Sequence, residues 1–212
     1  VAHEIKNPLT PMKLSIQHLK RIIEQKDESW EKQFKKISNT IIEQIDTLSS
    51  IASEFSDFAK MPLGQMESVD LCEILNREIE LYHNSGIDIS MKANIDGPCN
   101  VKADRKQIMR AFNNLIENAI QAVEGKKEPR IIIGLSEYPD LYRVAVKDNG
   151  VGIEPAIMEK IFSPNFTTKS SGMGLGLAIV KSIIMESGGT IDFTSEPGSG
   201  TTFIVDLPKE KQ

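Results

Sequence analysis

Hydrophobic side chains in the first 60 residues follow a heptad rhythm that predicts two long helices. Apolar residues recur at alternating steps of three and four, the spacing of a coiled-coil seam, at Leu9, Met12, Ile16, Leu19 and Ile23. The same rhythm returns further along the chain, at Phe34, Ile37, Ile41, Gln44, Leu48, Ile51, Phe55 and Phe58. The polar residues 26–29 separate the two series, so we predict a helical hairpin.

The second predicted helix carries more apolar surface than one partner helix can cover. Ile42, Ile45, Ala52 and Ala59 lie beside its seam and widen the apolar stripe. Two hairpins that pair through such stripes bury them in a four-helix bundle. We therefore predict a homodimer.

The heptad rhythm stops at residues 61–65, where Pro62 and Gly64 end helical structure. We place a linker at 61–67, between a hairpin domain at 1–60 and a second domain at 68–212. Shorter elements are predicted there: helices at 71–83, 104–124 and 175–187, and strands at 87–91, 130–137, 142–147, 190–195 and 201–206. This order is typical of an α+β two-layer sandwich, with a mixed or mostly antiparallel sheet and helices on one face.

Charge and cysteine content exclude several classes of protein. The chain has 212 residues, 40% of them hydrophobic, and a net charge of −5, which excludes a disordered or collagen-like chain. It lacks the basic surface that nucleic-acid binding requires. Cys72 and Cys99 make no disulfide framework, and neither has a second Cys or a His at metal-ligand spacing.

The ends and the hydropathy of the chain suggest where it works. No stretch approaches the roughly 18 apolar residues of a membrane span, and no signal peptide precedes the first helix, so we expect a cytoplasmic location. The chain opens on Val1 in a helical pattern. We therefore expect that an upstream sensor region is missing, and anchoring of the full-length protein in an inner membrane stays open.

The first candidate for chemistry is His3, followed by Glu4 and Asn7. A solvated imidazole keeps a nucleophilic ring nitrogen at neutral pH. Glu4 can accept the Nδ1 proton and leave Nε2 free to attack. Asn7, one helical turn further on, can hold a water in line with a group attached to the ring. Taken alone, a surface histidine beside a glutamate more often has no catalytic role.

Two asparagines form the second candidate site. Asn114 and Asn118 lie one turn apart on one face of the helix predicted at 104–124, with apolar residues on its other side. Two neutral amides suit Mg²⁺ that already carries phosphate charge. The alternative is that both are exposed polar positions of an amphipathic helix.

Asp148 heads a third candidate, directly after a predicted strand, and Gly150, Gly152 and Ile153 follow it. Glycines permit a backbone turn against a flat ligand, and a buried carboxylate can accept from an exocyclic amine such as that of adenine. The alternative is an ordinary turn, because Asp-Asn-Gly is also a good turn sequence.

A second glycine-rich segment leads into the last predicted helix, with Gly172, Gly174, Leu175, Gly176 and Leu177. Its small residues let backbone N–H groups and a helix N-terminus approach polyphosphate. It is neither a dinucleotide fingerprint nor a P-loop. The segment before it, 162–171, starts at Phe162 and contains Thr168 and Lys169, and reads either as a nucleotide lid or as a surface loop.

The order and spacing of these segments closely resemble the sensor histidine kinases of two-component systems. Five segments look like their H, N, G1, F and G2 boxes: His3-Glu4-x-x-Asn7-Pro8-Leu9, residues 114–119, Asp148-x-Gly150-x-Gly152, residues 162–166 and residues 172–177. The resemblance covers essentially the whole chain and is greatest to the nitrogen-regulation branch.

The resemblance implies a mechanism. ATP binds a Bergerat-type domain with Asp148 on the adenine amine, Asn114 and Asn118 on Mg²⁺ and phosphates, and 172–177 beneath the phosphates. The γ-phosphoryl group passes to His3 with Glu4 as base, and then to an aspartate of a response regulator. Asn7 is implied to orient water for dephosphorylating the regulator, so that the chain is both kinase and phosphatase.

Two other functions stay open. One is a degenerate kinase that serves as an ATP-binding dimeric scaffold. The other is an ATPase or serine kinase that shares the Bergerat nucleotide fold. Acid-labile, base-stable phosphate separates phosphohistidine from phosphoserine.

Overall fold

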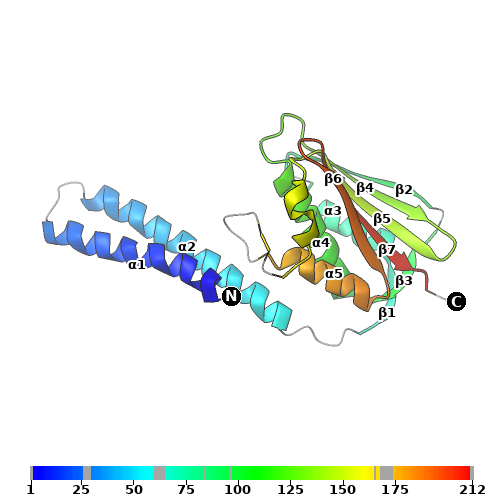
Figure 1. Cartoon of the computed structure of the whole chain (residues 1–212), viewed down its shortest axis with the longest axis horizontal. Helices are drawn as coiled ribbons and strands as arrows, with labels where there is room; N and C mark the ends of the chain where they lie inside the picture. The colour runs from blue at the N-terminus through cyan, green and yellow to red at the C-terminus, as the bar shows by residue number, and fades with distance from the viewer. Residues whose placement is uncertain are drawn as a thin grey trace. The chain divides into compact units, whose positions relative to one another are not determined.

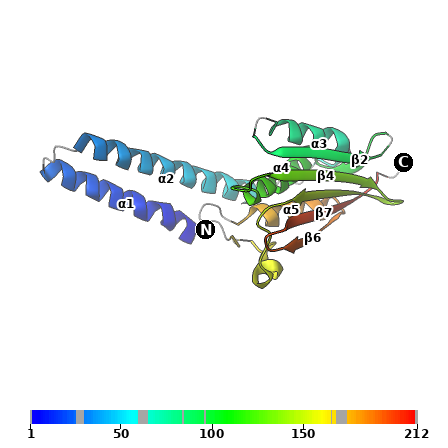
Figure 2. The same cartoon turned by 90° about the horizontal axis from the view of Figure 1, so that it is seen from above.

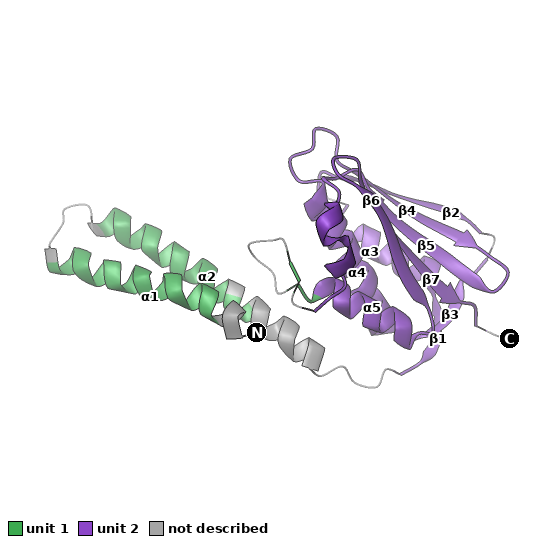
Figure 3. Ribbon diagram, viewed as in Figure 1, with its two compact units in different colours: residues 1–61, 165–175 green, residues 62–164, 176–212 purple. Residues whose placement is uncertain are grey.

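The chain forms two compact units in the computed structural model (Figure 3). One contains residues 1–61 with 165–175, and the other contains 62–164 with 176–212. The structure describes residues 2–25, 30–59, 65–83, 85–95, 97–164, 166–167 and 174–210. The predicted turn at 26–29 lies outside these ranges, and the boundary at residue 60 stays a prediction.

Two long helices make up most of the first unit, as the heptads predict. Helix α1 spans Ala2–Gln25 and α2 spans Trp30–Ala59, and the two pack against each other. Four residues of the seam predicted for α2 are half-buried, as expected of a face that packs against α1: Ile37, Ile41, Gln44 and Leu48. Phe34, which the prediction also placed in the seam, is exposed. The exposed Ile42 and Ile45 form the extra apolar surface that the sequence indicates.

The seam predicted for α1 is only partly right. Leu9, Ile16 and Ile23 are exposed, whereas Ile22, outside the predicted series, is buried at 5% exposure. The physical reason is that a heptad pattern predicts an apolar stripe on a helix but does not determine which partner helix packs on each part of that stripe. Within this chain, α2 covers only one edge of the stripe.

A five-stranded sheet is the frame of the second unit. Its strands are β2 (Asp88–Asn94), β4 (Arg130–Glu137), β5 (Leu141–Asp148), β6 (Thr190–Glu196) and β7 (Gly200–Pro208). Their order is β2-β4-β5-β7-β6, with β2 and β6 at the two edges (Figure 2). The β2–β4 pair is parallel and the other three pairs are antiparallel. The predicted mixed sheet is thus confirmed.

Three helices cover one face of this sheet: α3 (Leu71–Glu80), α4 (Arg105–Ala122) and α5 (Gly176–Glu186) (Figure 1). Alternate residues of β4 and β5 point into the layer between, which includes Ile131, Ile133, Val144 and Val146. Asp104 caps α4 as predicted, because its Oδ1 accepts from the Gln107 N–H at 2.9 Å.

Two short strands and a 3-10 helix have no counterpart in the sequence prediction. Strand β1 (Glu67–Asp70) pairs antiparallel with β3 (Asn100–Ala103), and Pro155–Lys160 forms one 3-10 segment. Glu67, which we place in the linker, is therefore the first residue of β1. Among the helices that the structure describes, none combines the length and apolarity needed to cross a membrane.

Candidate nucleotide-binding site

The centre of the site is the carboxylate of Asp148, the last residue of β5. It is only 3% exposed, and its Oδ1 accepts from the Gly150 N–H at 2.8 Å and from the Thr201 N–H at 3.2 Å. Burial raises the pKa of Asp148, and the two backbone hydrogen bonds oppose that rise. A carboxylate held in this way presents a fixed acceptor to a ligand.

The loop after Asp148 runs so close to its neighbours that two positions require glycine. A Cβ on Gly150 would lie 2.4 Å from the Ala122 carbonyl oxygen, at the end of α4. Gly152 has φ +71° and a Cβ there would lie 2.2 Å from the Glu196 carbonyl oxygen. The glycines that the sequence singles out therefore let this loop pass between α4 and the β6–β7 turn.

Residues of β6 and β7 complete the support of this loop. Ser195 Oγ accepts from the Ile153 N–H at 2.8 Å, donates to the Gly200 carbonyl at 3.0 Å and lies 2.9 Å from Thr201 Oγ1. Nothing in the sequence singles out Ser195 or Thr201 as a site residue, and Gly200 lies between the strands predicted at 190–195 and 201–206. Thr201 follows Gly200 at the start of β7 and Ser195 lies near the end of β6, and neither position has a sequence pattern that indicates a site.

Replacing Ser195 with alanine is expected to loosen the loop. The half-buried Ile153 N–H loses its acceptor, so we expect the free energy of unfolding to fall by about 1–2 kcal/mol. Nucleotide affinity should fall by about 3–10-fold, since only the position of the loop changes. Urea denaturation and a nucleotide titration measure both.

Ser182→Ala on α5 is the matched control for the lost hydroxyl. Ser182 Oγ makes a long 3.4 Å bond to Glu186 on the helix surface. We expect it to change stability by less than about 0.5 kcal/mol. Equal effects of the two substitutions would contradict a supporting role for Ser195.

The two predicted asparagines lie together on α4. Both are half-buried, which contradicts the alternative that they are simply exposed polar positions. Asn114 Nδ2 donates to the Arg110 carbonyl at 2.9 Å, and its Oδ1 lies 3.0 Å from where a Cβ of Gly176 would stand. The amide oxygen of Asn114 thus faces the first residue of α5.

The start of α5 can bind an anion through its backbone. Helix α5 begins at Gly176 and continues through Leu177, and the first N–H groups of a helix have no partner within it. The preceding segment also needs a glycine, because Gly174 has φ +63° and a Cβ there would lie 2.3 Å from the Phe166 carbonyl oxygen. Leu175 is 2% exposed.

Phe162 packs on the sheet. Its ring makes edge contacts with Phe193 at 5.9 Å and Phe203 at 6.4 Å, and Lys181 Nζ lies 5.5 Å from its centre. These contacts fix the residue from which the predicted lid starts. Thr168, Lys169 and Gly172 of that segment lie outside the described residues, so the lid stays a prediction.

The predicted phosphorylation site lies on the first helix. His3 and Glu4 belong to α1, and their side chains are outside the part that the structure describes. Asn7 follows on α1 and is exposed, and Pro8 and Pro11 lie inside the helix. Each proline removes a backbone donor, which loosens the helix in this first stretch.

Two family models match this chain. Residues 103–211 match the histidine kinase-, DNA gyrase B- and HSP90-like ATPase family, and residues 1–64 match the His Kinase A (phospho-acceptor) domain. The first range includes Asn114, Asn118 and Asp148, and the second includes His3.

Curated relatives match over almost the whole chain. The nitrogen regulation protein NtrY of Azorhizobium caulinodans is 31% identical over 99% of the chain and 28% of its own length. The signal transduction histidine-protein kinase AtoS of Escherichia coli is 30% identical over 100% of the chain and 34% of its own length. The chain thus spans about a third of these relatives.

Solved structures agree with the fold. The catalytic domain of histidine kinase ThkA is 33% identical, with a TM-score of 0.61 over 68% of this chain and 96% of that one. ThkA in complex with the response regulator protein TrrA is 30% identical, with a TM-score of 0.76 over 99% of this chain and 60% of that one.

Proposed function

Because this chain belongs to the sensor histidine kinases of two-component systems, we propose that it phosphorylates His3 from ATP and passes the phosphoryl group to an aspartate of a response regulator. The hairpin carries the histidine, and the sandwich binds the nucleotide. The match of residues 1–64 to the phospho-acceptor family and of residues 103–211 to the ATPase family supports this division.

The observation that carries the proposal is the buried carboxylate of Asp148. Since Oδ1 accepts both the Gly150 and Thr201 N–H groups, Oδ2 is the oxygen that accepts the exocyclic amine of adenine. The glycines at 150 and 152 let the loop after Asp148 pass close to the Ala122 and Glu196 carbonyls, which holds the loop in place beside the adenine. Burial strengthens this hydrogen bond, because competing water is excluded.

The phosphates lie, in this proposal, between α4 and the start of α5. Helix N–H groups from Gly176 onward bind phosphate oxygens, and Gly174 and Leu175 lead the chain into that position. The donor set fits Mg²⁺: Asn114 directs an amide oxygen at the start of α5, and Asn118 lies one turn away. When bound, Mg²⁺ neutralises charge on the phosphates.

The transfer step is an in-line displacement at the γ-phosphorus. His3 Nε2 forms the N–P bond, the bond from phosphorus to the β,γ-bridging oxygen breaks, and ADP leaves with the electron pair. Glu4 holds the Nδ1 proton, which favours attack by Nε2. In the phosphatase reaction, Asn7 orients the water that hydrolyses the phosphorylated regulator.

We also propose a homodimer formed by the hairpins. Exposed apolar residues lie on both helices, among them Leu9, Ile16, Ile42 and Ile45. Pairing two hairpins buries them in a four-helix bundle, which leaves the outer helix faces for a regulator. The complex of the related ThkA with TrrA supports a regulator as partner.

Incubation with γ-labelled ATP and Mg²⁺ tests the proposal. We expect label that acid removes and base does not, mapped to the peptide containing His3, and no label on His3→Gln. His18→Gln is the matched control, because His18 is exposed on the same helix. Nucleotide binding should be the same in all three proteins.

The same experiment separates the alternatives. Acid-stable label would indicate a serine kinase, and phosphate release without label would indicate an ATPase. ATP binding with neither labelled protein nor released phosphate would indicate a degenerate kinase that serves as an ATP-binding scaffold. Each of these results contradicts the proposed kinase.

A further inference from the structure

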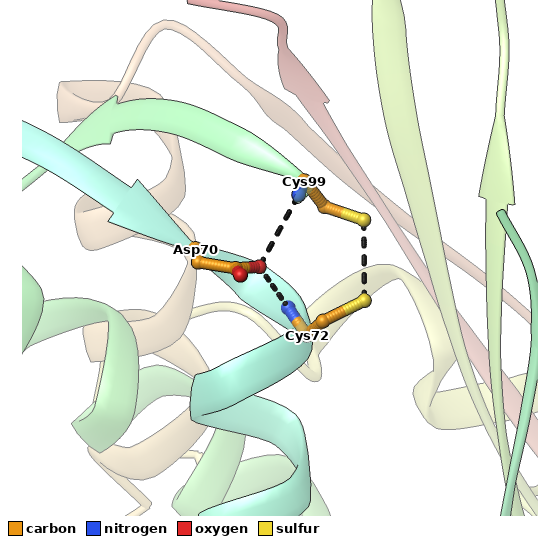
Figure 4. Close-up of side chains that lie close together, drawn as sticks. All are labelled: Asp70, Cys72 and Cys99. Atoms are coloured by element: carbon orange, nitrogen blue, oxygen red, sulfur yellow. Dashed lines mark hydrogen bonds between the residues drawn. The ribbon is translucent and has the colours of Figure 1, made fainter. Parts of the chain in front are cut away.

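The fold brings the chain's two cysteines together, outside the residues of the nucleotide site. Cys72 is the second residue of α3 and Cys99 directly precedes β3. They are 27 positions apart in the sequence, yet their Sγ atoms lie 3.2 Å from each other (Figure 4). Nothing in the proposed phosphoryl transfer uses this pair.

Backbone hydrogen bonds hold the two cysteines face to face. Asp70 Oδ1 accepts from the Cys72 N–H at 2.9 Å and from the Cys99 N–H at 3.2 Å (Figure 4). The Leu71 N–H also donates to the Cys99 carbonyl at 3.1 Å. The proximity of the sulfurs is therefore set by the chain around them rather than by two mobile side chains.

The geometry favours a direct bond between the sulfurs over a shared metal ion. Asp70, Cys72 and Cys99 form a group with one ligand atom each within 4.8 Å. Two thiolates on a tetrahedral zinc, each about 2.3 Å from the metal, would lie roughly 3.8 Å apart. The observed 3.2 Å is shorter, and the Asp70 Oδ1 already binds two N–H groups.

We propose that Cys72 and Cys99 form a reversible disulfide when a peroxide oxidises the protein. Cys72 is half-buried and Cys99 is fully buried, so Cys72 is the sulfur that meets the oxidant. Burial raises the pKa of the Cys99 thiol, as does its hydrogen bond with Cys72, which keeps Cys99 protonated until Cys72 has reacted.

The chemistry balances in two steps. Cys72 Sγ attacks hydrogen peroxide, the O–O bond breaks, and Cys72 sulfenic acid and water form. Cys99 Sγ then attacks Cys72 Sγ, the S–O bond breaks, and the hydroxyl leaves as water with the Cys99 proton. Two thiols are oxidised and one peroxide is reduced to two waters, and a dithiol reductant reverses the result by exchange.

The position of the bond predicts its effect. The charge of Glu137, at one end of β4, also raises the pKa of the Cys99 thiol, whereas Ile131 at the other end of β4 pairs with Asp148. The disulfide therefore closes the loop from 72 to 99 and joins α3 to β3 without touching the adenine pocket. We expect higher thermal stability and unchanged nucleotide affinity.

Peroxide oxidation of the whole chain, followed by a thiol assay and peptide mapping, tests the inference. We expect both thiols to disappear, the mass to fall by two hydrogens, and the peptides containing Cys72 and Cys99 to be linked within one chain. The Tm should rise by about 5–10 °C and return after dithiothreitol. The nucleotide Kd should stay within about twofold.

Two serine variants assign the roles of the sulfurs. In Cys99→Ser, a sulfenic-acid probe should label Cys72, whereas in Cys72→Ser it should not label Cys99. Because Cys99 is buried, Cys99→Ser can destabilise the fold. Peptide mapping of the oxidised protein without substitutions is therefore the independent test. Thiols that stay free, or disulfides only between chains, would overturn the inference.

Titration with Zn²⁺ alone tests whether the two cysteines bind a metal ion instead. Tight one-to-one binding that blocks peroxide oxidation, and is lost in both serine variants, would assign the pair to a metal and overturn the disulfide. Absence of tight binding would support it. Phosphorylation of His3 is measured separately in the reduced protein, so a failure of the disulfide inference can be told from a failure of the proposed kinase activity.

Discussion

Asp148→Asn is expected to lower the affinity for ATP by at least about 100-fold while the protein stays folded. The asparagine Oδ1 still accepts from the Gly150 and Thr201 N–H groups, so the loop keeps its position. Its Nδ2, however, takes the place of Oδ2 and turns a donor toward the donor amine of adenine. Isothermal titration with a non-hydrolysable ATP analogue measures the loss.

The same substitution has a pH signature. Burial raises the pKa of Asp148 above its ordinary value of 3.8, so the folded protein binds this proton more tightly than the unfolded chain does. This group therefore lowers stability as pH rises from about 4 through the raised pKa, and the effect persists at neutral pH. Asp148→Asn should be at least as stable as the unmodified protein at pH 7.

The control for the lost charge is Asp192→Asn on β6. Asp192 is exposed, and its Oδ1 accepts from the neighbouring Phe193 N–H. We expect its nucleotide affinity to change by less than about twofold. If Asp148→Asn bound ATP as tightly as this control, the assignment of the adenine pocket would be wrong.

Gly200→Ala is expected to be the most destabilising single-methyl change in the site. Gly200 has φ +110°, and a Cβ there would lie 2.1 Å from the Asp148 carbonyl oxygen and 2.9 Å from the Asn149 Cα. Since both are backbone atoms, β5 and β7 must separate where Thr201 reaches Asp148. We expect the free energy of unfolding to fall by about 3 kcal/mol or more, and ATP binding to be lost.

Gly198→Ala is the matched control in the same turn. Gly198 also has a positive φ of +80°, but a Cβ there would meet nothing within 4 Å. Its cost is the conformational strain alone, about 1 kcal/mol. Urea denaturation of both variants measures the difference, and equal losses would mean that the close approach at Gly200 does not matter.

The local elements follow from the sequence because their causes are local. The heptads predict α1 and α2, the Asp104 side chain caps α4 three residues ahead, and β4 has the predicted bounds Arg130–Glu137. Each of these signals acts between residues that are neighbours along the chain. The glycines at 150, 152 and 174 were recognisable for the same reason.

Contacts between distant segments were decided by the tertiary structure. Thr201 donates to Asp148 across 53 positions, Ser195 holds the Ile153 N–H across 42, and Cys72 meets Cys99 across 27. Strands β1 and β3 pair with each other, and Val101 of β3 also bridges to Lys209. A four-residue strand has too short a pattern to be recognised alone, and its stability comes from its partner.

The sequence by itself therefore determined the type and order of most elements and the residues that carry the proposed chemistry. Only the tertiary structure decided which backbone donors hold Asp148, which part of the α1 stripe α2 covers, and that the two cysteines meet. The physical reason is that periodicity and capping act within one element, whereas these contacts depend on how elements distant in the sequence pack against one another.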